Sequence, residues 1–284
     1  MPSRAAGPAS ASPRDGTPLR GAAASATAAL LLALLAACPP PPDGAGDGPG
    51  PRPLPQDPLA CLRLADEWSQ TGTSREKKLE ALAALDHAQS LGSDPYVTEV
   101  LRARTLFRLA EENETDARRG EWLDAALAAA RRAAEIRPER VEGHYYVAAV
   151  LGRVAERATV GALDMIPQIL AAAERSVEID RTYDNCGPLV ALGMLYIAAP
   201  PWPQSIGDPE TGIEYLRQAV ECSDFPVNRI MLAEALLDQG EFEEARDLLR
   251  WVLSRPPEGD WGVAGNKWRP IARELLDRAE HPGQ

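Results

Sequence analysis

Four cysteines and three histidines are the residues of this chain whose types could support nucleophilic, redox or metal chemistry. The histidines, His87, His144 and His281, lie far apart and follow no metal-ligand spacing. No HExxH, GxSxG or CxxC pattern and no phosphate-binding loop accompanies them. We therefore expect no enzymatic activity and neither a metal nor another cofactor.

Cys38 follows the signal of an exported protein. An uncharged apolar run, Ala22 to Ala37, is preceded by arginines, and it is short for a membrane span but typical of a secretory signal. The run ends in Leu35-Ala36-Ala37-Cys38, which matches the bacterial lipobox, so Cys38 would become the lipidated first residue. The sequence thus predicts a lipoprotein signal peptide over residues 1–37. An ordinary signal peptide with a chance cysteine is the alternative.

Residues 38–58 form a linker rich in proline and glycine, a composition that cannot build a packed core. In polyproline form it would hold a domain roughly 60 Å from a membrane, at about 3.1 Å per residue. Pro39 stands where some lipoproteins carry the Asp that retains them at the inner membrane. The expected location is therefore periplasmic, with a lipid anchor in the outer membrane.

Cys186 and Cys222 flank a segment that reads as a pair of helices, so both should lie at the same end of that pair. In an oxidising periplasm they could form a disulfide. Two free, buried thiols are the alternative, which the sequence alone leads us to favour.

The elements that would position these residues are helical. The chain is rich in Ala and Leu, aromatic residues make up 5%, and the formal net charge is −12. This composition favours an all-α fold. The negative charge argues against nucleic acid as a partner, because phosphates require Lys and Arg patches.

A repeat is visible near the C-terminus. Leu232 and Ala245 are thirteen residues apart, and Ala245 and Pro257 are twelve apart, as in the 34-residue helical hairpin of the tetratricopeptide repeat (TPR). The pattern recurs towards the N-terminus with longer turns, in the segments 186–222, 143–180, 96–138 and 59–92, and residues 266–281 form a last helix. We expect an α-solenoid of about five TPR-like hairpins with a C-terminal capping helix over residues 59–284. An amphipathic helical bundle shares the spacing of apolar residues but not the recurring Ala-to-Pro interval.

The repeat pattern also predicts which residues line the concave groove of the solenoid. Apart from Glu234 they are apolar: Tyr145, Ala149, Val190, Met194, Ile197, Ile230 and Leu237. Repeat proteins that clamp peptide carboxylates carry Lys, Arg and Asn on these faces, and here we find none. Such a strip must be covered by its own chain, by another subunit or by an apolar ligand. We take the seven apolar residues as candidate ligand-binding residues.

Two segments lengthen the turn inside a hairpin, residues 157–167 and residues 196–212. In the second, Asp208 and Pro209 read as the cap and first residue of a helix, and Gly207 allows the chain to turn. The preceding Pro200-Pro201-Trp202-Pro203 predicts a rigid loop that presents Trp202 to a partner or subunit.

The segment from Leu192 to Asp208 resembles the T component of TRAP transporter systems, a family of lipoproteins with cryptic TPRs. The matching residues are Leu192, Gly193, Leu195 and Tyr196, then Ala199, Pro200, Trp202 and Pro203, then Ser205, Gly207 and Asp208. The resemblance covers roughly residues 131–284. It implies a lipid-anchored periplasmic homotrimer that pairs with a solute-binding (P) subunit and binds or channels an apolar, possibly acidic small molecule.

The competing interpretation is a TPR scaffold for protein–protein interactions in the envelope, with the groove holding a partner helix or strand. The Trp202 loop separates the two, because a scaffold gives no particular reason for it, whereas the family resemblance does.

Overall fold

The computed structural model is an all-α molecule, and it describes residues 53–71, 74–113, 115, 117–158, 160–256 and 262–283. These residues form eleven α-helices. In chain order they are α2 (Pro58–Thr71), α3 (Arg75–Ser90), α4 (Pro95–Glu112), α5 (Arg119–Ile136), α6 (Val141–Arg157), α7 (Ala162–Asp180), α8 (Tyr183–Ala198), α9 (Pro209–Cys222), α10 (Pro226–Gln239), α11 (Phe242–Ser254) and α12 (Gly262–Glu280). The predicted signal peptide, Cys38 and most of the predicted linker lie outside the described residues.

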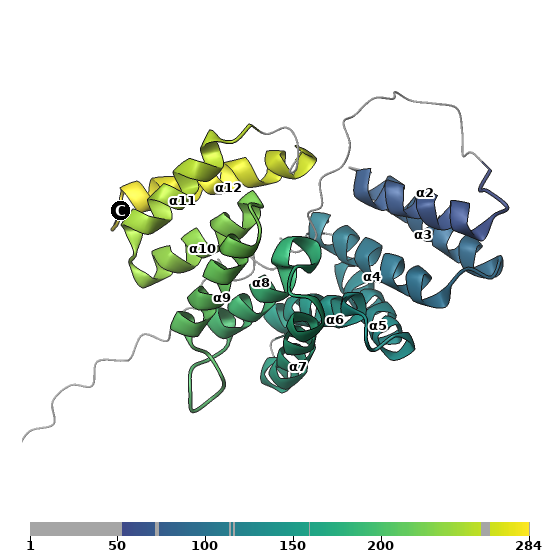
Figure 1. Cartoon of the computed structure of the whole chain (residues 1–284), viewed down its shortest axis with the longest axis horizontal. Helices are drawn as coiled ribbons and strands as arrows, with labels where there is room; N and C mark the ends of the chain where they lie inside the picture. The colour runs from purple at the N-terminus through teal and green to yellow at the C-terminus, as the bar shows by residue number, and fades with distance from the viewer. Residues whose placement is uncertain are drawn as a thin grey trace, which may run out of the picture.

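The helices pack as a linear array of antiparallel pairs. Each even-numbered helix from α2 to α10 packs most closely on the helix that follows it, and each pair then contacts the next. Helix α12 lies against α11 and α10 at the end of the array (Figure 1). Five hairpins and a final helix are what the repeat pattern predicts, and the solenoid fold is confirmed.

The array curves towards its first helices. Successive first helices, α2 with α4 and so on to α12, contact one another directly, whereas the second helices contact mainly their own partner and the next first helix. Closer packing on one side bends a stack of hairpins towards that side. We call the surface formed by α2, α4, α6, α8, α10 and α12 the inner face; in Figure 1 these helices border the opening of the arch.

Local sequence explains where several helices begin and end. Asp94 and Asp208 each accept hydrogen bonds from backbone N–H groups of the first turn, and a proline follows each of them. Gly240 ends α10 with a φ of 84°, a left-handed conformation that favours glycine. These features confirm the predicted cap at Asp208.

Glycines also set the spacing of the helices α8 and α9. A Cβ added to Gly193 would lie 2.8 Å from the carbonyl oxygen of Gly212, and one added to Gly212 would lie 2.5 Å from Ile197 Cγ1. Backbones can approach this closely only where side chains are absent. Gly193 and Gly212 therefore mark the close contact between α8 and α9.

One of the two predicted loop insertions is mostly helix. Helix α6 continues to Arg157 and α7 begins at Ala162, so the extra residues of the segment 157–167 lengthen the helices instead of forming a loop. Pro167 lies inside α7, in its second turn, where the N–H that proline lacks costs one helical hydrogen bond. The prediction that residues 157–167 lengthen the turn is therefore wrong for most of the segment, since Pro167 lies within a helix.

No helix in the described part of the chain is long and apolar enough to cross a membrane.

Candidate binding site on the inner face

The seven residues predicted to line a groove lie in the hydrophobic core. Six of them, Tyr145, Ala149, Val190, Met194, Ile230 and Leu237, are at most 3% exposed, and Ile197 is partly buried against the same cluster. The sequence left open whether these residues are covered by their own chain, by another subunit or by an apolar ligand. In the structure their own chain covers them. Their role in ligand binding stays a prediction.

Glu234 lies among these apolar residues of α10 and is 2% exposed. Its Oε1 atom is buried without a hydrogen-bond partner among the described residues. Burial is the main cause that raises the pKa of Glu234 to about 8; Asp238 adds to the effect, and Arg278 opposes it. At neutral pH this carboxyl is therefore mostly protonated and uncharged, as a carboxyl without a cationic partner in an apolar site must be.

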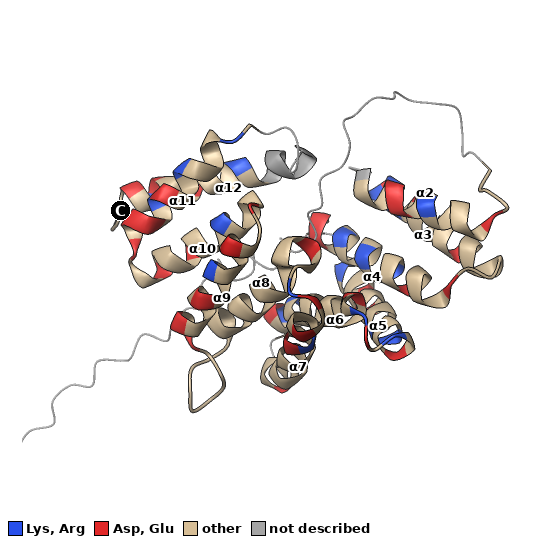
Figure 2. Ribbon diagram, viewed as in Figure 1, with Lys and Arg blue, Asp and Glu red and all other residues tan. Residues whose placement is uncertain are grey.

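The other half of the inner face is polar, which the sequence did not predict. Figure 2 shows basic residues on α4, whereas α8 is nearly uncharged beyond its first turn. On α4, Arg104 pairs with Asp66 of α2, and Arg108, one turn later, donates from Nη1 to the Ser69 carbonyl oxygen over 3.2 Å. The hairpin formed by α4 and α5 lacks the TPR consensus, so its sequence offered no register from which to place these arginines on the inner face.

Three tyrosines continue this polar region across α6 and the start of α8. Tyr145 packs edge-on against Tyr146 and Tyr183, with ring centroids 5.1 and 5.2 Å apart. The hydroxyls of Tyr146 and Tyr183 are hydrogen-bonded to each other. Burial raises the pKa of both hydroxyls well above the ordinary value of 10, so both are neutral groups that can donate a hydrogen bond. Arg104 and Arg108 partly oppose the shift at Tyr146.

The chain enters α8 through a left-handed turn of three non-glycine residues, Asp184, Asn185 and Cys186, with φ values of 48°, 57° and 68°. Such residues are strained, by about 1–3 kcal/mol each, and persist where their surroundings hold them. Asp184 accepts a 2.8 Å hydrogen bond from the Tyr145 hydroxyl, and Asn228 Nδ2 donates to the Asn185 carbonyl over 2.9 Å. The third contact that holds this turn is a disulfide bond at Cys186.

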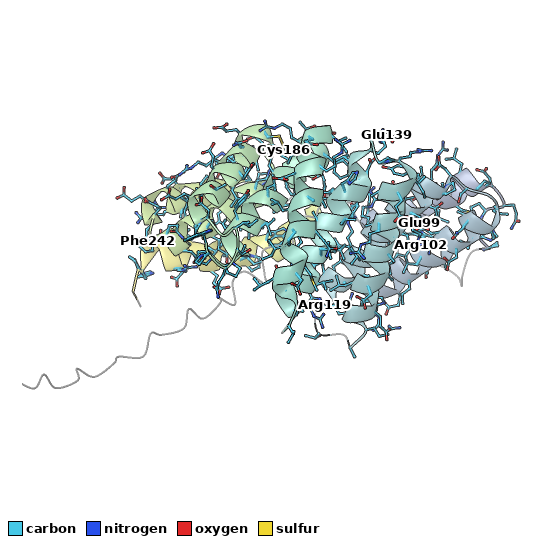
Figure 3. All side chains as sticks on the ribbon, turned by 90° about the horizontal axis from the view of Figure 1, so that it is seen from below. Glu99, Arg102, Arg119, Glu139, Cys186 and Phe242 are labelled. Atoms are coloured by element: carbon cyan, nitrogen blue, oxygen red, sulfur yellow. A yellow bond between two sulfur atoms is a disulfide. The ribbon has the colours of Figure 1, made fainter. Side chains whose placement is uncertain are left out.

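Cys186 and Cys222 form a disulfide, with their Cα atoms 6.2 Å apart. The two cysteines lie at the same end of their helix pair, as predicted. The free-thiol state, which the sequence alone led us to favour, is therefore not the state in the structure, and Cys61 is the free cysteine of the described residues. Figure 3 places Cys186 at the same edge of the array as Glu139, opposite Arg119.

Two backbone hydrogen bonds close the base of the loop between α8 and α9, which we call its neck, and the tip of the loop is exposed. Gly207 donates its N–H to the Pro200 carbonyl over 2.8 Å, and Asp208 donates to the Tyr196 carbonyl over 2.9 Å. A Cβ on Gly207 would lie 2.0 Å from the Ala199 carbonyl oxygen, so close approach, and not a left-handed turn, requires glycine here. Beyond this neck Trp202 is 85% exposed.

Among the described residues no group of three or more His, Cys, Asp or Glu side chains could hold a metal ion.

Comparisons with known proteins support the fold and go no further. No protein-family profile matches the chain, and no curated protein sequence matches it. The crystal structure of a thermophilic TPR protein of Thermus thermophilus is similar, with a TM-score of 0.56 and 17% sequence identity. The match covers 76% of this chain and 99% of that one. The chain therefore has the fold of a TPR solenoid.

Proposed function

We propose that this protein is a non-enzymatic binding component of the cell envelope, and specifically the lipid-anchored accessory subunit of a TRAP-type uptake system. In this role it pairs with a periplasmic solute-binding subunit and handles an apolar, possibly acidic small molecule. The observation that carries the proposal is the exposed Trp202 on a loop whose neck is fixed by two backbone hydrogen bonds. This loop is also the segment that carries the resemblance to the TRAP T components.

A large aromatic side chain held in one place is suited to anchoring a protein interface. Tryptophan is among the residues that contribute most to binding energy, and a rigid loop loses little conformational entropy on association. Tryptophan is highly buried on average, so a Trp202 side chain that is 85% exposed leaves a large apolar area in water.

A photo-crosslinking amino acid at Gln204, next to the loop tip, tests this pairing in the native envelope. We expect a cross-linked product whose second component is a TRAP-type solute-binding subunit, identified by mass spectrometry. Glu243, an exposed residue of α11, is the matched control position. Adding Trp202→Ala should abolish the product from position 204. The same yield from both positions, or a product with unrelated envelope proteins only, would contradict the proposed pairing.

Native mass spectrometry of the purified chain addresses the small molecule and the expected homotrimer. A trimer that releases an apolar adduct on denaturation supports ligand handling. The scaffold interpretation is the second candidate, and the structural similarity to a TPR protein favours it. A monomer without an adduct would select the scaffold.

A further inference from the structure

Arg108 is a buried cation that has no carboxylate partner among the described residues. Three cationic residues of the described chain are almost fully buried: Lys78, Arg108 and Arg153. Lys78 pairs with Glu112 at 2.5 Å, and Arg153 pairs with Glu111 at 2.5 Å and with Glu156 at 2.7 Å. No described carboxylate pairs with Arg108, which is 5% exposed, and its one hydrogen bond goes to a neutral carbonyl.

An anion would stabilise this arrangement. A buried charge without a partner costs several kcal/mol, because the solvation that it loses is not replaced. The Nε atom of Arg108 is buried and makes no hydrogen bond among the described residues. Since Nη1 is occupied by the Ser69 carbonyl, the Nε–Nη2 edge of the guanidinium is the part that no described residue uses.

That edge has the geometry of a carboxylate receptor. Two parallel N–H groups of a guanidinium match the two oxygens of one carboxylate, which gives a bidentate, charge-assisted pair.

The charged residues around Arg108 limit how much negative charge a bound anion can carry. Arg104 is already neutralised by Asp66, and Asp184 faces the tyrosines from the start of α8. One negative charge can therefore be balanced by Arg108, whereas a second would be repelled by these two carboxylates. A monoanionic carboxylate fits better than a phosphate dianion.

We propose that Arg108 is the receptor for a carboxylate group on the inner face. The carboxylate comes either from a small apolar acid or from the C-terminus of a partner chain. The proposal rests on a binding role for the inner face, but not on the TRAP assignment or on the Trp202 loop.

Isothermal titration of the full chain tests it with two probes, hexanoate and the peptide N-acetyl-alanyl-leucine with a free C-terminus. Hexanamide and the C-terminal amide of the peptide are the uncharged controls. We expect at least one carboxylate probe to bind, and its amide to bind about tenfold more weakly or not at all, because hydrogen bonds to charged groups are lost. The preferred probe identifies the source of the carboxylate.

Arg108→Met should weaken binding of the preferred probe at least about tenfold without lowering the unfolding temperature, since an apolar side chain of similar length often replaces a buried charge at no cost. Arg102→Met, which removes a partly exposed arginine paired with Asp86, should leave binding unchanged. If Arg108→Met fails to fold, Arg108→Lys is the second variant. It keeps the positive charge but lacks the two parallel N–H groups of the guanidinium, and it should weaken binding to the same degree.

Three results would overturn the proposal. The first is no binding of either carboxylate probe up to about 10 mM. The others are equal binding of an acid and its amide, and unchanged binding of the preferred probe by the Arg108 variant. A failure here leaves the cross-linking result at the Trp202 loop untouched, so the two proposals fail separately.

Discussion

Glu234 is the residue at which pH should act most strongly on stability. It is almost fully buried, and its pKa is about 8 against an ordinary value of 4.5. As pH rises, the unfolded chain releases this proton near 4.5, whereas the folded chain keeps it until about pH 8. The unfolded state therefore binds fewer protons in this interval, and the free energy of unfolding falls as pH rises through it. Below pH 4.5 both states are protonated and the loss disappears.

The size of the effect follows from the two pKa values. Each pH unit between them lowers the free energy of unfolding by about 1.36 kcal/mol. At pH 7 the loss is about 3 kcal/mol, and over the whole interval it approaches about 5 kcal/mol. Domains are commonly stable by only about 5–15 kcal/mol, so removing the ionisable group should change stability visibly.

Urea unfolding of the wild type and of Glu234→Gln at pH 5 and pH 8 measures this loss. The amide cannot ionise, so the advantage of the variant over the wild type should grow by about 3 kcal/mol between the two pH values. Glu156→Gln is the comparison: the pKa of Glu156 is raised only to about 7, mainly by burial, and its carboxylate pairs with Arg153. The pH-dependent change should therefore have the same sign but be smaller, and loss of the ion pair should destabilise this variant overall. Parallel pH profiles for the wild type and Glu234→Gln would refute the assignment of a neutral, unpartnered carboxyl to this site.

Two further predictions concern the packing and the covalent link. Replacing both Cys186 and Cys222 by serine should lower the free energy of unfolding by about 4 kcal/mol, because the disulfide closes a segment of 36 residues; mass mapping of unreduced peptides that finds these cysteines unlinked would contradict the bond. Gly193→Ala should lower the unfolding free energy by about 1–3 kcal/mol through overpacking against α9. Gly120→Ala is the control, because a Cβ added there meets no atom within 4 Å. This variant should leave the unfolding free energy unchanged or raise it by up to about 1 kcal/mol. Equal effects of Gly193→Ala and Gly120→Ala would be evidence against the close approach of α8 and α9.

Local patterns made the fold predictable. The intervals from Leu232 to Ala245 and on to Pro257 carry the repeat, because small residues are needed where two helices cross and proline ends the second helix. The cap at Asp208 likewise depends on its neighbours in sequence. The segment 157–167 was harder, since a proline near the start of a helix and a proline in a loop look alike in sequence.

The candidate site was much less predictable. The sequence placed Tyr145, Met194 and Leu237 on the concave side but did not show that its own chain buries them. It gave no register for α4, so Arg104 and Arg108 were missed. The pairing of Cys186 with Cys222 depends on a 6.2 Å separation of their Cα atoms, which spacing along the chain suggests but does not fix.

The sequence by itself determined that the chain forms helices, that they pair as hairpins of TPR length, and where most of them begin and end, because these properties depend on contacts between near neighbours. Only the tertiary structure decided which residues of the inner face are buried, which buried charges have a partner, and which strained turn is held in place. Those outcomes depend on how far the array curves, and the curvature is the summed result of packing between helices that are distant in sequence.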